Sequence, residues 1–395
     1  MGNIIDYLKE YGEYSLLERP FCDEDSLVLA QFSYLKLENI VPGLSRGEPG
    51  VTPGEIGRLK NKEELFADER YARQNAALFE AIRRSRRFQT MKLTGYINRI
   101  DVREPSQFSA VTCLLEDDSA YVAFRGTDET LSGWKEDFAM AYRAPVRSQE
   151  LSVDYLNRTM VYSGGALIVG GHSKGGNLAV YASMYCEEAV RKRIRRIYNL
   201  DGPGFCPQLR ENGAYREIAP RIRKIVPHSS VVGMLLEDTG CYETVESSAF
   251  GVLQHDPYSW VIKDGKFVTV SDVYRGRRAA MEVLNRWIRS LTKEELGNMI
   301  EEIFDIIGAS GAQTLLDFSG NWRPAARRMA AAFHDMEKER KKELWRAMAA
   351  LLPAVREVWR RADEEQGPAE GTQGYTPVRE AEGNAGKSAA REGEG

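Results

Sequence analysis

The feature that most constrains the fold is a change of hydrophobic period between residues 166 and 186. Residues 166–169, Ala-Leu-Ile-Val, form a short apolar run that predicts a buried strand. From Asn177 onward the apolar residues recur at helical spacing, which predicts a helix. The two elements are separated by only a few residues, so the chain must turn sharply between them.

The turn itself, residues 171–175, reads Gly-His-Ser-Lys-Gly and fits the pattern G-x-S-x-G. Such a turn holds its central residue in a strained conformation and lifts the hydroxyl into the open. Small residues two positions away on each side let the backbone pass without collision. The helix that follows directs its free N–H groups to the same place. The motif predicts a nucleophile elbow with Ser173 as nucleophile, and the alternative is a structural Gly-rich turn.

A second stretch with chemical meaning is residues 122–128, Val-Ala-Phe-Arg-Gly-Thr-Asp. A strand ending in Arg-Gly-Thr can turn an N–H near Thr127 toward the elbow. Acyl transfer needs two such donors, because negative charge develops on the carbonyl oxygen. We therefore predict an oxyanion hole made by Thr127 and by Lys174, the residue after the nucleophile. For Arg125 and Asp137 we expect a structural ion pair, and a helix cap is the other interpretation of Thr127.

Strand and helix patterns alternate along the first two thirds of the chain. Residues 25–35, 62–88 and 147–162 predict helices, residues 94–102, 107–115 and 120–124 predict strands, and residues 43–57 predict a loop. This alternation around a strand–turn–helix unit predicts an α/β fold with a mostly parallel sheet flanked by helices.

Composition argues against several classes of function. The chain has 395 residues and a net charge of −4, so we expect no nucleic-acid partner. Its five cysteines are scattered and form no C-x-x-C pair, which argues against a disulfide framework or a zinc site. Neither a phosphate-binding glycine motif nor a His-Glu-x-x-His motif is present, so we expect no cofactor and no metal. The absence of a signal-peptide pattern and of a long apolar run favours a cytoplasmic protein.

Several motifs together resemble a known family. Phe-Arg-Gly-Thr, Trp-x-x-Asp-Phe at 134–138 and Gly-His-Ser-Lys-Gly-Gly-Asn-Leu-Ala resemble the class 3 lipases. The chain is more closely similar to a bacterial branch of α/β-hydrolases often called Mbeg-like. Asn-Leu-Asp-Gly-Pro-Gly-Phe at 199–205 and Gln-His-Asp-Pro-Tyr-Ser-Trp at 254–260 also match that branch. The resemblance covers about residues 1–310 and implies an α/β-hydrolase fold with a Ser-His-acid mechanism.

The resemblance also orders the catalytic residues, because α/β-hydrolases place the histidine after the acid on a late loop. His255 follows Ser173 by 82 residues in a turn-like Gln-His-Asp-Pro context, and we predict it as the catalytic base. The other histidines fit less well. His172 is expected to be structural or pocket-lining, His228 lies near a strand end, and His334 lies in a charge-rich helical region.

The acid departs from the family pattern. Class 3 lipases usually carry it in an Asp-x-Val-Pro-like segment, but the matching residues 229–232 read Ser-Ser-Val-Val. Asp201 instead ends the predicted strand beyond the elbow, at the sheet edge where ligands bind. We predict that Asp201 orients the imidazole and stabilises its cation. The alternative is a turn-forming Asp before Gly, with Glu237 or Asp238 as the acid.

The last third of the chain has a different character and predicts helices at 276–306 and 324–362. We expect a hydrolase domain at 1–275, a helical appendage at 276–363 and a disordered tail at 364–395. Residues 323–361 carry 11 Lys or Arg against five Asp or Glu, with Trp residues nearby (Trp322, Trp345, Trp359). Such helices either pack their apolar face on the core or contact an anionic membrane surface weakly.

Two hypotheses about function follow. The first is a serine esterase that cleaves a lipid or other acyl ester through Ser173, His255 and Asp201, with a covalent acyl-enzyme intermediate. The second is a catalytically inactive scaffold that binds an acyl ligand or a protein partner. The missing acid at the usual position keeps the second hypothesis open.

Overall fold

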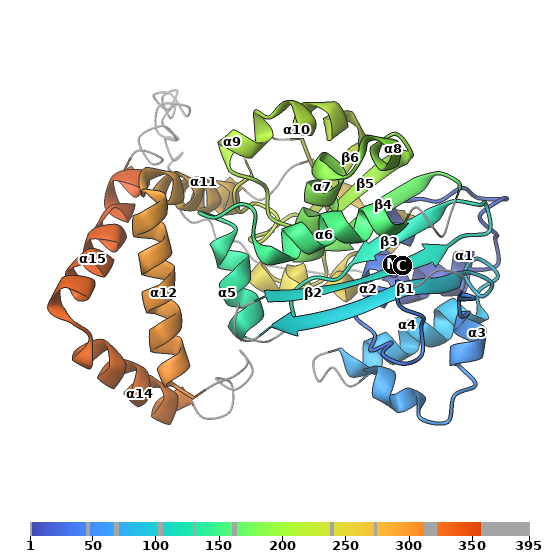
Figure 1. The fold of residues 1–395 in the computed structure, drawn as a ribbon, viewed down its shortest axis with the longest axis horizontal. Coiled ribbons are helices and arrows are strands. Elements are labelled where there is room, and N and C mark those ends of the chain that lie inside the picture. Colours follow the sequence, from blue (N-terminus) through green and yellow to red (C-terminus); the bar gives the residue numbers. More distant parts are fainter. Residues whose placement is uncertain are drawn as a thin grey trace, which may run out of the picture.

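The computed structural model describes residues 2–44, 48–66, 71–101, 106–128, 131–159, 164–237, 241–271, 275–311 and 322–356. A single large sheet forms its centre, with strand order β1-β2-β3-β4-β5-β6-β7-β10 (Figure 1). The pairings from β3 to β7 are parallel, and the pairings β1–β2, β2–β3 and β7–β10 are antiparallel. The predicted α/β class with a mostly parallel sheet is therefore confirmed.

The strands range from two residues in β10 to ten in β1. They are β1 (Lys92–Asp101), β2 (Ser106–Leu114), β3 (Ala120–Phe124), β4 (Leu167–His172), β5 (Ile194–Leu200), β6 (Ile222–Pro227), β7 (Glu243–Val245) and β10 (Thr269–Val270). A separate small hairpin pairs β8 (Ile262–Lys263) with β9 (Lys266–Phe267).

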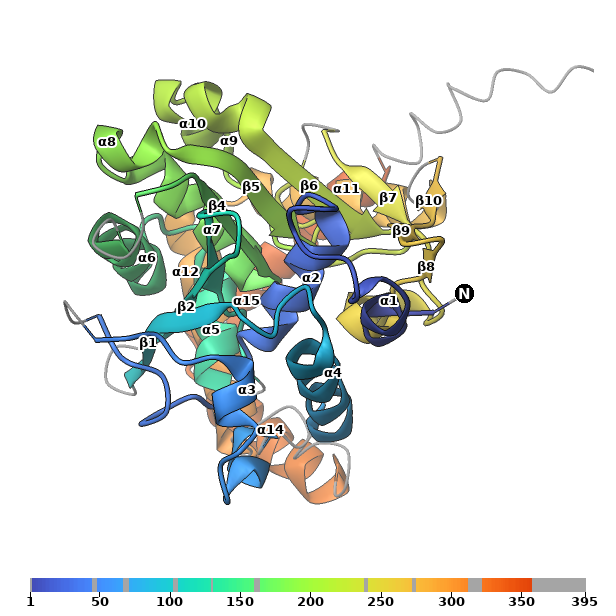
Figure 2. The ribbon, with the colours of Figure 1, turned by 90° about the vertical axis from the view of Figure 1, so that its right-hand side faces the viewer.

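Helices cover both faces of the sheet, because successive side chains of a strand point to opposite faces. Tyr121 and Ala123 of β3 join one apolar cluster with α1, α2 and α4, while Val122 and Phe124 join another with α6 and α7 (Figure 2). The helices of these layers are α1 (Ile4–Tyr11), α2 (Asp23–Phe32), α3 (Pro53–Ile56), α4 (Ala72–Arg84), α5 (Leu131–Ala139), α6 (Arg147–Arg158), α7 (Lys174–Tyr185), α8 (Glu188–Arg191), α9 (Pro207–Arg210) and α10 (Gly213–Ile218).

The strand predicted at 120–124 is β3, and the other predicted helices and strands of the first 160 residues are present with shifted ends. Residue 102 of one predicted strand and residues 160–162 of one predicted helix lie outside the described residues. One prediction is wrong: the loop at 43–57 contains the short helix α3. Thr52 caps this helix by accepting a hydrogen bond from the Glu55 N–H at 3.2 Å, and Pro53 occupies its first turn. The predicted helix at 62–88 consists of a 3₁₀ turn, Lys62–Phe66, and then α4, while residues 67–70 lie outside the described part of the chain.

The C-terminal helices are α11 (Arg275–Ser290), α12 (Lys293–Ala309), α14 (Trp322–Asp335) and α15 (Lys338–Ala349). Helix α12 packs on α5, where the rings of Phe138 and Phe304 lie 5.8 Å apart and Lys135 pairs with Glu301. No described helix combines the length and the apolar character needed to cross a bilayer. Trp359 and the tail predicted at 364–395 lie outside the described residues.

Candidate active site

The predicted elbow geometry is present at the end of β4. Ser173 follows this strand directly, caps α7, and has a left-handed φ of 58° with ψ of −134°. A Cβ at Gly171 or at Gly175 would overlap the carbonyl oxygen of Phe124. Only glycine therefore lets β3 and the turn approach this closely.

The segment after β3 lies directly against the turn that carries Ser173. A Cβ at Gly126 would stand 3.0 Å from Cβ of Ser173 and 2.7 Å from the carbonyl oxygen of His172. Thr127 comes next in the chain, and Lys174 opens α7, where an N–H has no intrahelical acceptor. Among the described hydrogen bonds, none uses the backbone N–H of Thr127 or of Lys174. Both predicted donors thus flank the Ser173 turn with their N–H groups available.

The acid and the histidine meet as predicted. Nδ1 of His255 donates to Oδ2 of Asp201 at 2.7 Å, and the Asp201 side chain is fully buried. The second carboxylate oxygen accepts from Oγ of Ser230 at 2.5 Å and from the N–H of Gly233 at 3.2 Å. The predicted Asp201–His255 contact is therefore confirmed, and Ser230 is a supporting residue that the sequence analysis did not identify.

Of the two alternative acids, the structure describes Glu237, and it is paired elsewhere. The carboxylate of Glu237 accepts from Nζ of Lys224 at 2.6 Å in a buried ion pair. Asp238 lies outside the described residues. Asp201 is the carboxylate whose contact with His255 the structure records.

The ring of His255 lies beside the turn that carries Ser173. Its centroid is 4.5 Å from that of His172, the residue before Ser173, and the two planes are inclined by 33°. His172 is buried, in line with a structural or pocket-lining role. The described hydrogen bonds do not include one between the Ser173 hydroxyl and Nε2 of His255. Such bonds often tighten only when substrate binds.

Gln254, which the sequence analysis missed, holds the turn that carries His255. Its side-chain oxygen accepts from the N–H of Ser229 at 2.7 Å, and Nε2 donates to the carbonyl of Ala249 at 2.9 Å. The same nitrogen lies 3.0 Å from Nε2 of His228. The amide therefore ties the His255 turn to the end of β6. Its position beside the candidate histidine was the only sequence signal for this role.

A buried charge cluster joins the two predicted donor segments. The Lys174 side chain is 1% exposed, and Nζ lies 3.0 Å from Oε2 of Glu136 and 3.3 Å from Oδ1 of Asp137. The other oxygen of Asp137 accepts from Oγ1 of Thr127 at 2.6 Å. Helix α5 thus connects the side chains of both residues whose backbone N–H groups were predicted to act as donors.

The predicted Arg125–Asp137 ion pair is wrong. Asp137 pairs with Lys174, and Nη2 of Arg125 donates to the side-chain oxygen of Asn98 at 2.9 Å. The helix turn of α7 brings the lysine toward α5, and this relationship is not visible in the local sequence.

The ionisation of the cluster follows from its surroundings. Burial alone would lower the pKa of Lys174, but the charges of Asp137 and Glu136 outweigh this effect and raise that pKa. Burial raises the pKa of Asp137 more than the Lys174 ammonium lowers it. In the part of the chain that the structure describes, no group of His, Cys, Asp and Glu side chains is arranged to hold a metal ion.

Comparisons with known proteins identify the family. No curated protein matches the chain. A crystal structure titled M37 lipase shares 15% identity with it, covering 53% of this chain and 68% of the lipase chain, with a TM-score of 0.31. A family model described as Mbeg1-like matches residues 82–305, more than half of the chain. The resemblance to the Mbeg-like branch is thereby confirmed, and this chain belongs to the Mbeg1-like family.

Proposed function

We propose that this chain is a serine hydrolase that cleaves the carboxylic ester of an acyl or lipid substrate. One observation carries the proposal: a fully buried Asp201 carboxylate accepts from His255, whose ring centroid lies 4.5 Å from that of His172, the residue preceding Ser173. A strained serine, an imidazole and a buried carboxylate at one sheet edge are the groups that nucleophilic acyl transfer requires.

In the proposed reaction, Oγ of Ser173 attacks the ester carbonyl while Nε2 of His255 accepts the hydroxyl proton. Asp201 holds the Nδ1–H tautomer and stabilises the imidazolium. The C–O bond of the tetrahedral intermediate then breaks, and the imidazolium gives its proton to the leaving alcohol. Water attacks the acyl-enzyme by the same path and releases the acid.

The oxyanion of each tetrahedral intermediate would accept from the backbone N–H groups of Thr127 and Lys174. Donors fixed before the reaction stabilise developing charge without reorganising, and one such donor contributes on the order of 10²–10³ in kcat. The ion pair of Lys174 with Glu136 and Asp137 supports this role, since it restrains both donor segments.

The surroundings of His255 favour an apolar substrate. Phe250 and Leu253 precede it closely in the chain, and they are 85% and 60% exposed. Large exposed apolar side chains on the segment that carries the candidate histidine favour an apolar ligand. We therefore infer that the acyl part of the ester is a hydrocarbon chain.

Labelling with a fluorophosphonate probe tests the proposal, because the probe reacts with an activated serine. We expect the probe to label the wild-type protein and not the Ser173→Ala variant. Ser290→Ala, which removes an exposed helical hydroxyl, serves as the matched control and should be labelled as wild type. A folded wild-type protein that resists the probe would favour the inactive scaffold.

A further inference from the structure

Helix α15 has two apolar faces, and only one of them is covered. Leu344 and Ala347 are buried against α12, with the indole N–H of Trp287 donating to the Ala347 carbonyl at 2.7 Å. Trp345, by contrast, is 59% exposed, and Leu352, in the helical residues that follow α15, is 60% exposed. One apolar side of α15 thus packs on α12, another helix of the C-terminal segment, whereas Trp345 faces away from that packing.

The exposed side chains share one side of the helix. Ala350 ends α15 with helical backbone angles (φ −64°, ψ −13°), and residues 351–356 are helical again, so the direction of the chain is nearly kept. Side chains that recur three, four or seven positions apart lie on one helix face. We call the following set the outer face: Lys338, Lys342, Trp345, Met348, Leu352 and Arg356.

The charge of this region is opposite to that of the rest of the chain. Residues 322–356 contain nine Lys or Arg against four Asp or Glu, whereas the whole chain is net −4. Arg340 is used on the inner side, where it pairs with Glu302 and Asp305 of α12. On the outer face, Lys342 lies 3.7 Å from Glu339, and both are well exposed, so this pair is weak.

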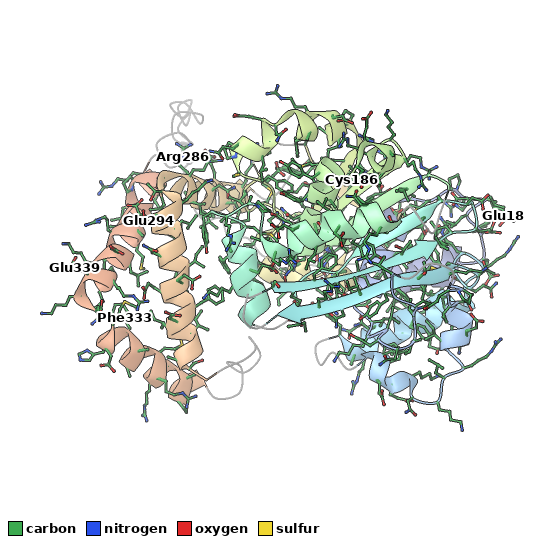
Figure 3. All side chains as sticks on the ribbon, in the orientation of Figure 1. Glu18, Cys186, Arg286, Glu294, Phe333 and Glu339 are labelled. Atoms are coloured by element: carbon green, nitrogen blue, oxygen red, sulfur yellow. The ribbon has the colours of Figure 1, made fainter. Side chains whose placement is uncertain are left out.

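Lys338 and Arg356 take part in no ion pair among the described residues. The side of α15 remote from α12, where Glu339 lies, is turned outward from the molecule (Figure 3). Within the described part of the chain, the outer face is therefore positive, apolar at its centre and exposed.

We propose that the outer face docks on an anionic lipid surface. Trp and Leu enter the boundary between headgroups and acyl chains, and flanking Lys and Arg extend their ammonium and guanidinium groups to lipid phosphates. A nucleic acid would bind the basic side chains, but it offers no apolar region for the exposed Leu and Met at the centre of the outer face. A two-fold contact with a second copy would bring the same positive charges together. This contact is independent of the proposed hydrolase chemistry, and it lies beyond the segment 82–305 that matches the family model.

Sedimentation of the full-length protein with lipid vesicles tests the proposal. At low salt we expect binding to vesicles of phosphatidylcholine mixed with phosphatidylserine. Binding to pure phosphatidylcholine should be at least about tenfold weaker, because each basic residue near an anionic surface strengthens binding about fivefold. Added salt should weaken the binding to mixed vesicles in the same way. No binding at low salt, or equal binding to both vesicles, overturns the proposal.

Variants then assign the contact to the outer face. Trp345→Ala/Leu352→Ala and Lys338→Gln/Lys342→Gln should each lower affinity for mixed vesicles at least about tenfold. Their matched controls, Leu17→Ala/Leu59→Ala and Lys60→Gln/Lys263→Gln, change exposed residues elsewhere and should bind as wild type.

The result that would overturn the assignment is binding by the outer-face variants equal to that of wild type. A change in their oligomeric state, measured by light scattering, with unchanged vesicle binding would assign the face to a second copy. Circular dichroism checks that each variant is folded. Ser173→Ala should bind vesicles as wild type, so failure of the hydrolase proposal and failure of this one are distinguishable.

Discussion

Asp201 and His255 are joined by a hydrogen bond of 2.7 Å although they lie 54 positions apart in the chain. The backbone around Asp201 adopts an unusual conformation and approaches its carboxylate closely. Asp201 has a left-handed φ of 50°, and a Cβ at Gly233 would overlap its Oδ1. A carboxylate that is fully buried and bonded to an imidazole, a hydroxyl and an N–H does more than form a turn.

Asp201→Asn should lower kcat on an ester substrate by about 10⁴-fold with little loss of stability. The asparagine oxygen still accepts from Ser230 and Gly233, but its NH₂ then faces His255 and favours the wrong imidazole tautomer. Asp238→Asn is the comparison and should leave kcat nearly unchanged. Steady-state kinetics on purified proteins measures both, and the opposite ranking would assign the acid to the later segment.

Replacement of Ser173 separates catalysis from backbone strain. Ser173→Ala and Ser173→Gly should both lose ester hydrolysis by at least about 10³-fold, because each lacks the nucleophile. Ser173→Gly should be the more stable of the two by about 1 kcal/mol, since only glycine adopts a φ of 58° without strain. Urea denaturation gives the comparison. An alanine variant that is clearly more stable than the glycine variant would contradict the strained elbow.

Gly126 lies so close to the Ser173 turn that adding one methyl group at position 126 should disturb the site. In Gly126→Ala the new Cβ would overlap the hydroxyl of Tyr34 and would meet the carbonyl oxygen of His172 at 2.7 Å and Cβ of Ser173 at 3.0 Å. The donor segment must then shift, and kcat should fall at least about tenfold while KM changes less. Gly213→Ala is the control, because its Cβ would meet nothing within 4 Å. Equal kinetics of the two variants would argue against a donor at Thr127.

The Lys174 cluster should contribute strongly to stability. Lys174→Met leaves the buried Glu136 and part-buried Asp137 without their counter-charge, and the free energy of unfolding should fall by about 3–5 kcal/mol. Lys192→Met, which breaks an exposed pair with Glu188, should cost less than about 1 kcal/mol. Urea denaturation near neutral pH measures both losses. Equal losses would show that the cluster is no stronger than a surface pair.

The same cluster predicts a pH dependence. The pKa of Lys174 is raised above its ordinary value of 10.5, so its stabilising charge is fully present below that value and is lost as pH rises through the raised pKa. The difference in unfolding free energy between wild type and Lys174→Met should therefore be constant from about pH 8 to 10 and narrow above that range. Denaturation at several alkaline pH values tests this, and a difference that widens would contradict the raised pKa.

Much of the site was predictable because its parts are local. The strand at 166–169, the G-x-S-x-G turn and the following helix are neighbours in sequence, so periodicity and glycine spacing suffice to predict an elbow at Ser173. The carboxyl ends of neighbouring parallel strands meet at one sheet edge, which is why Asp201 could be placed near the elbow before any contact was known.

Other features depend on which segments the fold brings together. From the sequence, either Arg125 or Lys174 could have paired with Asp137. Because α5 packs on the Ser173 turn, Asp137 pairs with Lys174. Nothing in the local sequence marks the amide of Gln254 or the hydroxyl of Ser230 as important. Their roles follow from the contact between the turns that carry them at the end of β6.

The sequence by itself determined the α/β class and the elbow, because these follow from local period, and its resemblance to a known family implied the order of the candidate catalytic residues. Only the tertiary structure decided the ion-pair partner of Lys174, the support of His255, and which apolar face of α15 is covered. The physical reason is that ion pairs, buried amides and helix packing depend on contacts between residues far apart in the chain, which spacing along the sequence does not specify.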